Sequence, residues 1–220
     1  MNKEVIQQLF PKKALITVAG TVGIGKTTFA THIANILCYH TSLEKVDDNP
    51  YLGKFYSDFK HWAFHLQIYF LAERFKAHKN IMDTPYGVVQ DRSIYEDTGI
   101  FAQMHYEKGN MTKVDFNTYT ELFNAMVLTP YFQPPDILIY LEGSLEKILE
   151  KIRTRGREIE KQTPIEYWKE MQERYNYWIK TFNHCPVIRI NIDQYDLHHH
   201  PESIEPILKD IAQTMRQKDT

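Results

Sequence analysis

The stretch Gly20-Thr21-Val22-Gly23-Ile24-Gly25-Lys26-Thr27-Thr28 decides both the fold and the class of ligand. It has the form G-x-x-x-x-G-K-T, in which glycines let successive backbone N–H groups turn inward around a phosphate. Lys26 can then reach the β- and γ-phosphates of a nucleotide, and the Thr27 hydroxyl can bind Mg²⁺. We therefore expect all nine residues to form a nucleotide-binding loop.

The sequence on either side of this loop supports the same interpretation. The run Ala14–Ala19 is apolar and rich in β-branched residues, which is typical of a buried parallel strand. From Thr27 to Tyr39, apolar residues recur at helical spacing, and a helix there would point its positive end at the phosphate. A strand-to-helix turn that binds nothing is the alternative, and it leaves the lysine and threonine unexplained.

Length and composition indicate one compact domain covering residues 1–220. Of the 220 residues, 43% are hydrophobic and 25% are charged, which allows a sizeable core. The formal net charge is −2 and there is no long basic tract, so we expect no nucleic-acid partner. There is no run of 18 apolar residues, and Met1–Lys13 lacks the apolar core of a signal peptide, so we expect no membrane association.

The two cysteines, Cys38 and Cys185, have no spacing typical of a metal or redox site. We expect both to be small buried hydrophobic residues, because unpaired cysteine behaves in that way in most proteins. This usage fits a reducing compartment, and the sequence therefore predicts a cytoplasmic location.

Strands alternate with helices along the chain. The strand-like runs are Ala14–Ala19, Thr41–Val46, Gly87–Gln90, Asp136–Leu141 and Pro186–Ile192. Helical patterns start at Thr27 and Asn49-Pro50 and cover His61–Lys79, Ser93–Glu107, Asp115–Thr129, Ser144–Arg153, Pro164–Phe182 and Glu202–Met215. This alternation predicts an α/β fold with a five-stranded parallel sheet flanked by helices. Ligands in such folds bind at the carboxyl ends of the strands.

Charged residues stand at three of these strand ends, the last of them Glu142 after the fourth strand. Glu44 comes at the end of the second predicted strand, and Asp91-Arg92 follows the third. A carboxylate there can accept a proton from an attacking hydroxyl or hold Mg²⁺, and an arginine can neutralise charge on a transferring group. Taken singly, Glu44 could be a solvated loop acid, and Asp91 could cap a helix that starts at Ile94. Their occurrence beside a phosphate-binding loop favours the functional interpretation.

A second basic segment surrounds Gly156. It contains Lys151, Arg153, Arg155 and Arg157. Cations favour the carboxyl end of a helix, so a solvated helix end is one explanation. In a protein with a phosphate-binding loop we favour a mobile lid, since guanidinium groups match phosphate oxygens and closure excludes water.

One predicted helix carries polar residues within an aromatic, apolar stretch. Gln67 and Arg74 are seven residues apart, which places them on one face of the helix His61–Lys79. A glutamine amide offers a donor and an acceptor in one plane, which suits the edge of a nucleobase. The alternative is a core helix whose polar residues face water, and periodicity alone does not separate the two.

Together, five motifs resemble the deoxyribonucleoside kinase family, in its bacterial deoxyadenosine/deoxycytidine/deoxyguanosine branch. They are the glycine loop; Glu44 with Asn49-Pro50-Tyr51-Leu52 and Phe55-Tyr56; Trp62-x-Phe64-x-x-Gln67; Asp91-Arg92-Ser93-Ile94-Tyr95-Glu96-Asp97; and Arg153-x-Arg155-Gly156-Arg157. The resemblance runs from Ile16 to about Leu197. It implies a P-loop kinase fold with an arginine-rich lid, and an enzyme that transfers phosphate from ATP or GTP to the 5′-hydroxyl of a deoxyribonucleoside with Mg²⁺.

The resemblance also implies catalytic roles. Glu44 corresponds to a carboxylate that contacts the 5′-hydroxyl, and it is our preferred general base. Asp91 corresponds to an acid near Mg²⁺ and is the alternative base, while Thr27 and Asp91 are the metal-site residues. Arg92 corresponds to an arginine between the 5′-oxygen and the phosphate. Lys151 stands where the family has an arginine.

For the nucleoside, the resemblance assigns Tyr56 and Glu160 to the 3′-hydroxyl. Gln67 corresponds to the residue that reads the base edge, with Arg74 and Asp97 beside it. Phe101 corresponds to an aromatic residue that stacks on the base. The pair Arg74 and Asp97 resembles members that accept purines or deoxycytidine, whereas thymidine-accepting members are less polar there. We therefore expect deoxyadenosine and deoxycytidine as substrates, with deoxyguanosine third, and a homodimer.

Two other classes of protein share part of this pattern. A nucleoside monophosphate kinase of the thymidylate type would share the loop, the Asp-Arg pair and a lid, but Glu44 and Glu160 would repel an acceptor phosphate. A GTP-driven switch would carry D-x-x-G and N-K-x-D motifs, and the sequence contains neither. Both explain fewer residues than a nucleoside kinase does.

Overall fold

The computed structural model describes residues 3–44, 49–195 and 200–217, which fall into two compact units. Unit 1 comprises Met1–Leu43, Thr84–Arg92 and Pro134–Thr220, and unit 2 comprises Glu44–Asp83 and Ser93–Gln133. The chain leaves unit 1 directly after two strand ends, at Leu43 and at Arg92. A single domain over residues 1–220 stays a prediction.

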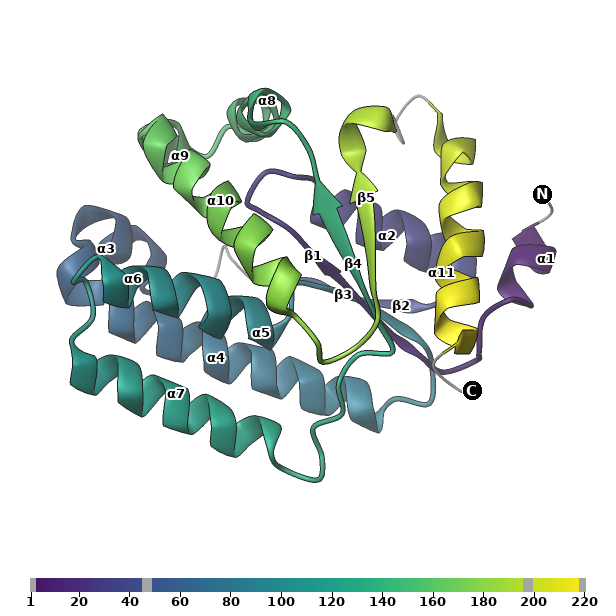
Figure 1. Cartoon of the computed structure of the whole chain (residues 1–220), viewed down its shortest axis with the longest axis horizontal. Coiled ribbons are helices and arrows are strands. Elements are labelled where there is room, and N and C mark those ends of the chain that lie inside the picture. Colours follow the sequence, from purple (N-terminus) through teal and green to yellow (C-terminus); the bar gives the residue numbers. More distant parts are fainter. Residues whose placement is uncertain (1–2, 45–48, 196–199, 218–220) are drawn as a thin grey trace. The chain divides into compact units, whose positions relative to one another are not determined.

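Unit 1 is built on a five-stranded parallel sheet, which confirms the predicted fold class (Figure 1). Its strands are β1 (Leu15–Ala19), β2 (His40–Ser42), β3 (Val88–Asp91), β4 (Ile137–Glu142) and β5 (Val187–Asn191). The spatial order is β2-β3-β1-β4-β5. The central strand β1 pairs with β3 and β4, and all five of its residues are buried. The predicted strand Thr41–Val46 is realised only as the short edge strand β2, and Lys45–Asp48 lie outside the described residues.

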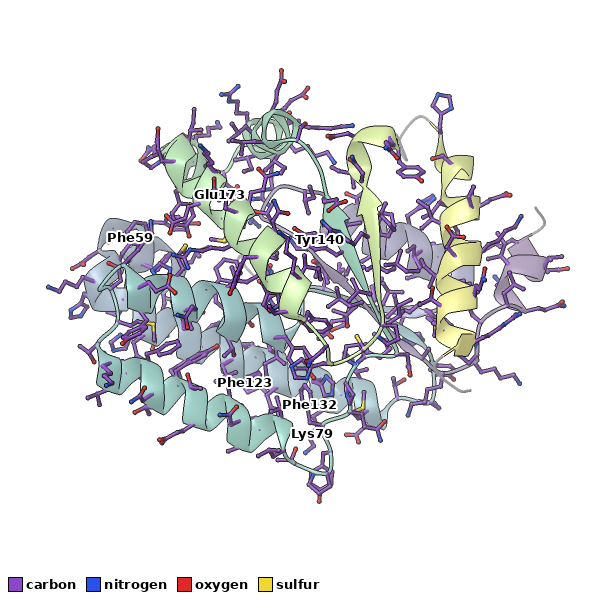
Figure 2. The ribbon with its side chains drawn as sticks, in the orientation of Figure 1. Phe59, Lys79, Phe123, Phe132, Tyr140 and Glu173 are labelled. Atoms are coloured by element: carbon purple, nitrogen blue, oxygen red, sulfur yellow. The ribbon has the colours of Figure 1, made fainter. Side chains whose placement is uncertain are left out.

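Helices pack on both faces of this sheet. In unit 1 they are α1 (Lys3–Gln7), α2 (Lys26–Leu37), α8 (Leu145–Arg155), α9 (Glu158–Lys161), α10 (Ile165–Thr181) and α11 (Glu205–Gln217), with 3-10 turns η2 (Ile192–Gln194) and η3 (Pro201–Ile204). On one face, Ile16 of β1 belongs to an apolar cluster with Ile33 of α2 and Ile211 of α11. On the other, Tyr140 of β4, which is labelled in Figure 2, stacks on Tyr175 of α10 with ring centroids 6.4 Å apart.

Unit 2 is helical within its described residues. It contains α3 (Leu52–Ser57), α4 (Phe59–Asp83), α5 (Ile94–Glu96), the π-helical segment η1 (Asp97–Ala102), α6 (Gln103–Glu107) and α7 (Lys113–Val127). The single helix predicted over Ser93–Glu107 is thus divided by π-helix. Its first residue is capped by Ser93, whose backbone N–H donates to Glu96 at 2.7 Å. The interpretation of Asp91 as the cap of this helix is wrong, because Asp91 belongs to β3.

One further expectation fails at Cys38, which is exposed rather than buried. Cys38 ends α2 with a left-handed φ of 56°, and its sulfur accepts a hydrogen bond from Gln7 Nε2 at 3.2 Å. Because Cys38 leaves the helical conformation, its side chain does not continue the buried face of α2. Cys185 is only partly buried. Among the helices of the described ranges, none has the length and apolar character needed to cross a bilayer.

Candidate active site

The glycine loop between β1 and α2 adopts a backbone that its glycines make possible. Gly23 and Gly25 have φ values of 81° and 106°, in the left-handed region that side chains disfavour. A Cβ on Gly23 would lie 2.5 Å from Cγ1 of Ile152. Helix α8 therefore packs directly onto the loop, and this close approach is possible only because residue 23 is glycine.

Two lysines place their ammonium groups against this loop. Lys26, the first residue of α2, is only 7% exposed, and its Nζ donates to the Thr21 carbonyl at 3.0 Å. Lys151 reaches the loop from α8 and donates to the Ile24 carbonyl at 3.1 Å. Lys26 lies where the motif predicts a phosphate-binding lysine. Lys151 was not among the predicted binding residues, and the structure nevertheless brings it to the loop.

Thr27 and Asp91 bring two oxygen ligands together. The Thr27 hydroxyl donates to Asp91 Oδ2 at 2.5 Å, and Asp91 is 2% exposed at the end of β3. The parallel register that pairs Val18 with Asp91 places this carboxylate beside the start of the glycine loop. Hydroxyl and carboxylate oxygens are hard ligands that suit Mg²⁺, so the residues present fit the predicted metal.

Arg92 is held in an unusual backbone conformation. Its φ is 72°, which is rare for a residue with a side chain, and it is 4% exposed. Its backbone N–H donates to the Val18 carbonyl at 2.9 Å, and Nη1 donates to the Tyr175 hydroxyl at 2.9 Å. Strained residues cluster at functional sites, which agrees with the predicted role of Arg92. The sequence did not predict a role for Tyr175, because Tyr175 lies 83 residues after Arg92 and no motif near either residue links the two.

The predicted lid arginines do not behave alike. Arg153 is exposed on α8, whereas Arg155 donates through Nε and Nη2 to Glu160 Oε2 at 3.0 and 2.5 Å. Arg157 Nη1 lies 3.5 Å from Glu160 Oε1. Glu160 itself is 6% exposed on α9, a helix that the sequence did not predict. The acid predicted for the 3′-hydroxyl therefore binds two of the arginines predicted for phosphate.

In unit 2, Arg74 joins two acids. Its Nε donates to Asp97 Oδ2 at 3.0 Å, and its Nη2 forms an ion pair with Glu44 Oε1. Arg74 is 7% exposed and Asp97 is 3% exposed, while the Glu44 side chain keeps 19%. The structure thus brings together a predicted catalytic acid and two residues predicted to lie beside the base. In this trio two acidic side chains share one arginine.

Gln67 lies on the same helix as Arg74 and is 2% exposed. Its Oε1 is buried and has no hydrogen-bond partner among the described residues. The alternative in which Gln67 and Arg74 face water is therefore wrong. A buried amide oxygen without a partner is costly, so a ligand that donates to it would be favoured.

The other residues predicted to bind the nucleoside are Tyr56, Phe101 and Glu160. Tyr56 and Phe101 are half-buried in unit 2. Glu160 belongs to unit 1, so its pairing with Tyr56 around a 3′-hydroxyl stays a prediction, as does stacking of Phe101 on a base. Lys26, Asp91 and Arg92 belong to unit 1 and Glu44 to unit 2.

Comparison with known proteins gives consistent matches over nearly the whole chain. The family described as deoxynucleoside kinase matches residues 16–216. The deoxyadenosine/deoxycytidine kinase of Bacillus subtilis (strain 168) is 61% identical over 202 residues, which cover 92% of this chain and 93% of that protein. The deoxyadenosine kinase of M. mycoides with dCMP and dCDP bound is 31% identical, with a TM-score of 0.77 over 89% of this chain and 99% of that one. The same enzyme with bound dATP also gives a TM-score of 0.77, at 32% identity and the same coverage.

Proposed function

The chain belongs to the deoxynucleoside kinase family, and from this we propose that it phosphorylates the 5′-hydroxyl of deoxyadenosine and deoxycytidine, with deoxyguanosine as a third acceptor. As a member, it is a phosphotransferase of deoxynucleoside salvage that uses a nucleotide as phosphoryl donor. The choice of nucleosides is supported by the name of the 61% identical relative and by the buried polar set Gln67, Arg74 and Asp97.

The pairing of two carboxylates, Glu44 and Asp97, with the guanidinium of Arg74 is the observation that carries this proposal. A neutral nucleoside can approach such a trio, whereas a nucleoside monophosphate would bring two further negative charges toward it. A thymidylate-type kinase would require additional cations at this place. The structure therefore favours an acceptor without phosphate.

For the donor, we propose ATP or GTP with Mg²⁺. Lys26 and the backbone N–H groups of Gly20–Thr28 would bind the β- and γ-phosphates. Thr27 and Asp91 would hold Mg²⁺, which supplies charge neutralisation on the phosphates when it is bound. Arg92, Arg153, Arg155 and Arg157 would neutralise charge on the transferring group. The protein's work in such a transfer is chiefly positioning and electrostatic stabilisation.

We propose Glu44 as the group that accepts the proton from the 5′-hydroxyl. Asp91 is the alternative, but its Oδ2 already accepts the Thr27 hydroxyl at 2.5 Å, which suits a metal-site acid better than a proton acceptor. Glu44 keeps part of its side chain exposed, so a substrate hydroxyl can reach it. Tyr56 and Glu160 are proposed for the 3′-hydroxyl and Phe101 for stacking on the base.

A coupled ADP-release assay with Mg·ATP tests the proposal, with deoxyadenosine, deoxycytidine, deoxyguanosine, thymidine and dTMP as acceptors. We expect turnover with the first two and loss of turnover in Lys26→Ala, the control for contaminating kinases. Faster turnover of thymidine than of the other three nucleosides would contradict the prediction that Arg74 and Asp97 favour purines or deoxycytidine. Turnover of dTMP alone would contradict the nucleoside assignment.

The assembly and location are proposed on the sequence and the family resemblance. We propose a homodimer formed through helices that flank the sheet, acting in the cytoplasm. Light scattering coupled to gel filtration measures the mass directly, and a monomer mass near 26.1 kDa at assay concentration would contradict the dimer.

A further inference from the structure

We infer that Arg74 is a positioning residue for Glu44, in addition to its proposed place beside the nucleobase. The inference rests on the proposed function, in which Glu44 accepts the proton of the 5′-hydroxyl. It concerns contacts that lie wholly within unit 2.

Arg74 binds the two acids with different parts of its guanidinium group. Nε is used for Asp97 at 3.0 Å, and Nη2 is used for Glu44. Because a guanidinium is planar and rigid, fixing Nε against Asp97 also fixes the direction in which Nη2 points. Asp97 is 3% exposed in the π-helical segment, so this anchor is itself well packed. The contact with buried Asp97 therefore fixes Arg74, and Arg74 in turn fixes the more exposed carboxylate of Glu44.

Glu44 needs such support because its backbone offers little. It lies two residues after the end of β2, outside any helix or strand. A carboxylate on an irregular segment can occupy several rotamers, and an ion pair with a buried arginine selects one of them. The same cation offsets the cost of keeping a charged carboxylate at a site that is four-fifths buried.

Tyr119 of α7 is an ionisable group that interacts with Asp97 and Arg74 of this trio. Its hydroxyl lies 3.5 Å from Thr98 Oγ1, and burial together with the Asp97 charge raises the pKa of Tyr119. Tyr119 is therefore neutral at working pH.

This arrangement gives Arg74 an effect on kcat. If Arg74 served only to read the base, its loss would raise the KM for the nucleoside. Because it also holds Glu44, its loss should lower kcat and move the acidic limb of the pH profile, where the proton-accepting group of the free enzyme titrates.

The test compares kcat, KM and the pH dependence of kcat/KM for deoxyadenosine in wild type, Arg74→Gln and Arg74→Lys. We expect Arg74→Gln to lower kcat at least tenfold and to raise the midpoint of the acidic limb by about one pH unit, as removal of a nearby opposite charge does. Arg74→Lys keeps the charge, so the midpoint should stay near the wild-type value while kcat falls because the fork geometry is lost. Lys76→Gln is the matched control, since Lys76 is exposed on the same helix and pairs with Glu73.

A second variant guards against misfolding. Arg74→Gln leaves two carboxylates close together, so the double variant Arg74→Gln/Asp97→Asn removes one of them as well. Its midpoint should still be raised, but by less than in Arg74→Gln, because a like charge near Glu44 is also gone. The inference would be overturned if folded Arg74→Gln and the double variant raised the KM for deoxyadenosine but left the midpoint of the acidic limb unchanged. Failure of the underlying function is recognised separately: wild type would then be inactive with every nucleoside, or Glu44→Gln would retain near-normal turnover.

Discussion

Arg92 Nη1 donates a hydrogen bond to the Tyr175 hydroxyl across 2.9 Å, and both side chains are buried. This contact joins the end of β3 to the middle of α10 within unit 1. It also fixes the guanidinium of a residue whose φ of 72° costs on the order of 1 kcal/mol in backbone strain. The strain is tolerated because hydrogen bonds at the backbone and at the side chain define a single conformation.

Tyr175→Phe should therefore lower kcat about tenfold while leaving the fold intact. The substitution removes one hydrogen bond to a charged group, worth about 1.5–3 kcal/mol, and leaves the stacking on Tyr140 in place. Steady-state kinetics and thermal unfolding measure the two effects. Tyr177→Phe is the control, because Tyr177 is 72% exposed on the same helix. Equal kcat values for the two variants would show that Arg92 needs no support from Tyr175.

Gly23→Ala should abolish nucleotide binding. The added Cβ would lie 2.5 Å from Ile152 and would require a φ of 81°, so either the loop or α8 must move. Stabilisation of the protein by Mg·ATP in a thermal shift assay measures the loss. Gly53→Ala is the control: nothing lies within 4 Å of its Cβ, and alanine is favoured over glycine in a helix by about 1 kcal/mol. A normal ATP-induced shift in Gly23→Ala would contradict the packing argument.

Glu160→Gln should raise the KM for deoxyadenosine more than that for 2′,3′-dideoxyadenosine, which lacks the 3′-hydroxyl. The reason is that a carboxylate accepts a hydroxyl hydrogen more strongly than an amide does. Glu158→Gln on the same helix is the control, since its side chain is 75% exposed. An equal rise for both nucleosides would mean that Glu160 acts only through Arg155 and Arg157.

The stability of the protein should fall in acid because of His78. Burial lowers the pKa of His78 to about 4. Its ring stacks on that of Phe132, which is labelled in Figure 2, with centroids 3.9 Å apart. The unfolded chain, in which the pKa is about 6.5, then binds more protons between pH 6.5 and 4, so the free energy of unfolding decreases as pH falls. We expect a loss of about 2 kcal/mol from pH 7.5 to pH 5 through this residue.

Urea unfolding at both pH values tests the assignment to His78. His78→Phe keeps the aromatic stack and should remove that part of the pH dependence. His65→Phe, at an exposed position of the same helix, should leave it unchanged. A pH dependence that survives in His78→Phe would place its origin elsewhere.

The central part of the fold could be predicted because it is encoded locally. β1 is buried over its whole length and appears in the sequence as a continuous apolar run. The edge strands β2 and β5 are partly exposed, so their patterns are weaker, and β2 has only three residues. The π-helical segment η1 and the helix α9 could not be predicted, because segments of a few residues are too short to show a recurring pattern of apolar residues.

The candidate site was predictable to a similar degree. The glycine loop and the Asp91-Arg92 pair are each contiguous in the chain, so both could be proposed as site residues from the sequence without knowledge of the fold. Contacts made across the fold were not predictable, as with Tyr175, which binds Arg92 from a position 83 residues later. Glu160 shows the same limit: its pairing with Arg155 and Arg157 depends on how the chain turns after α8, which the residue types do not specify.

The division of the chain has a practical consequence for engineering. The residues proposed to face the nucleobase lie in two segments, 44–83 and 93–133, and each segment leaves the sheet-bearing unit after one strand and rejoins it ahead of another. Grafting both segments from a relative of different preference would exchange the acceptor specificity and leave the donor machinery untouched.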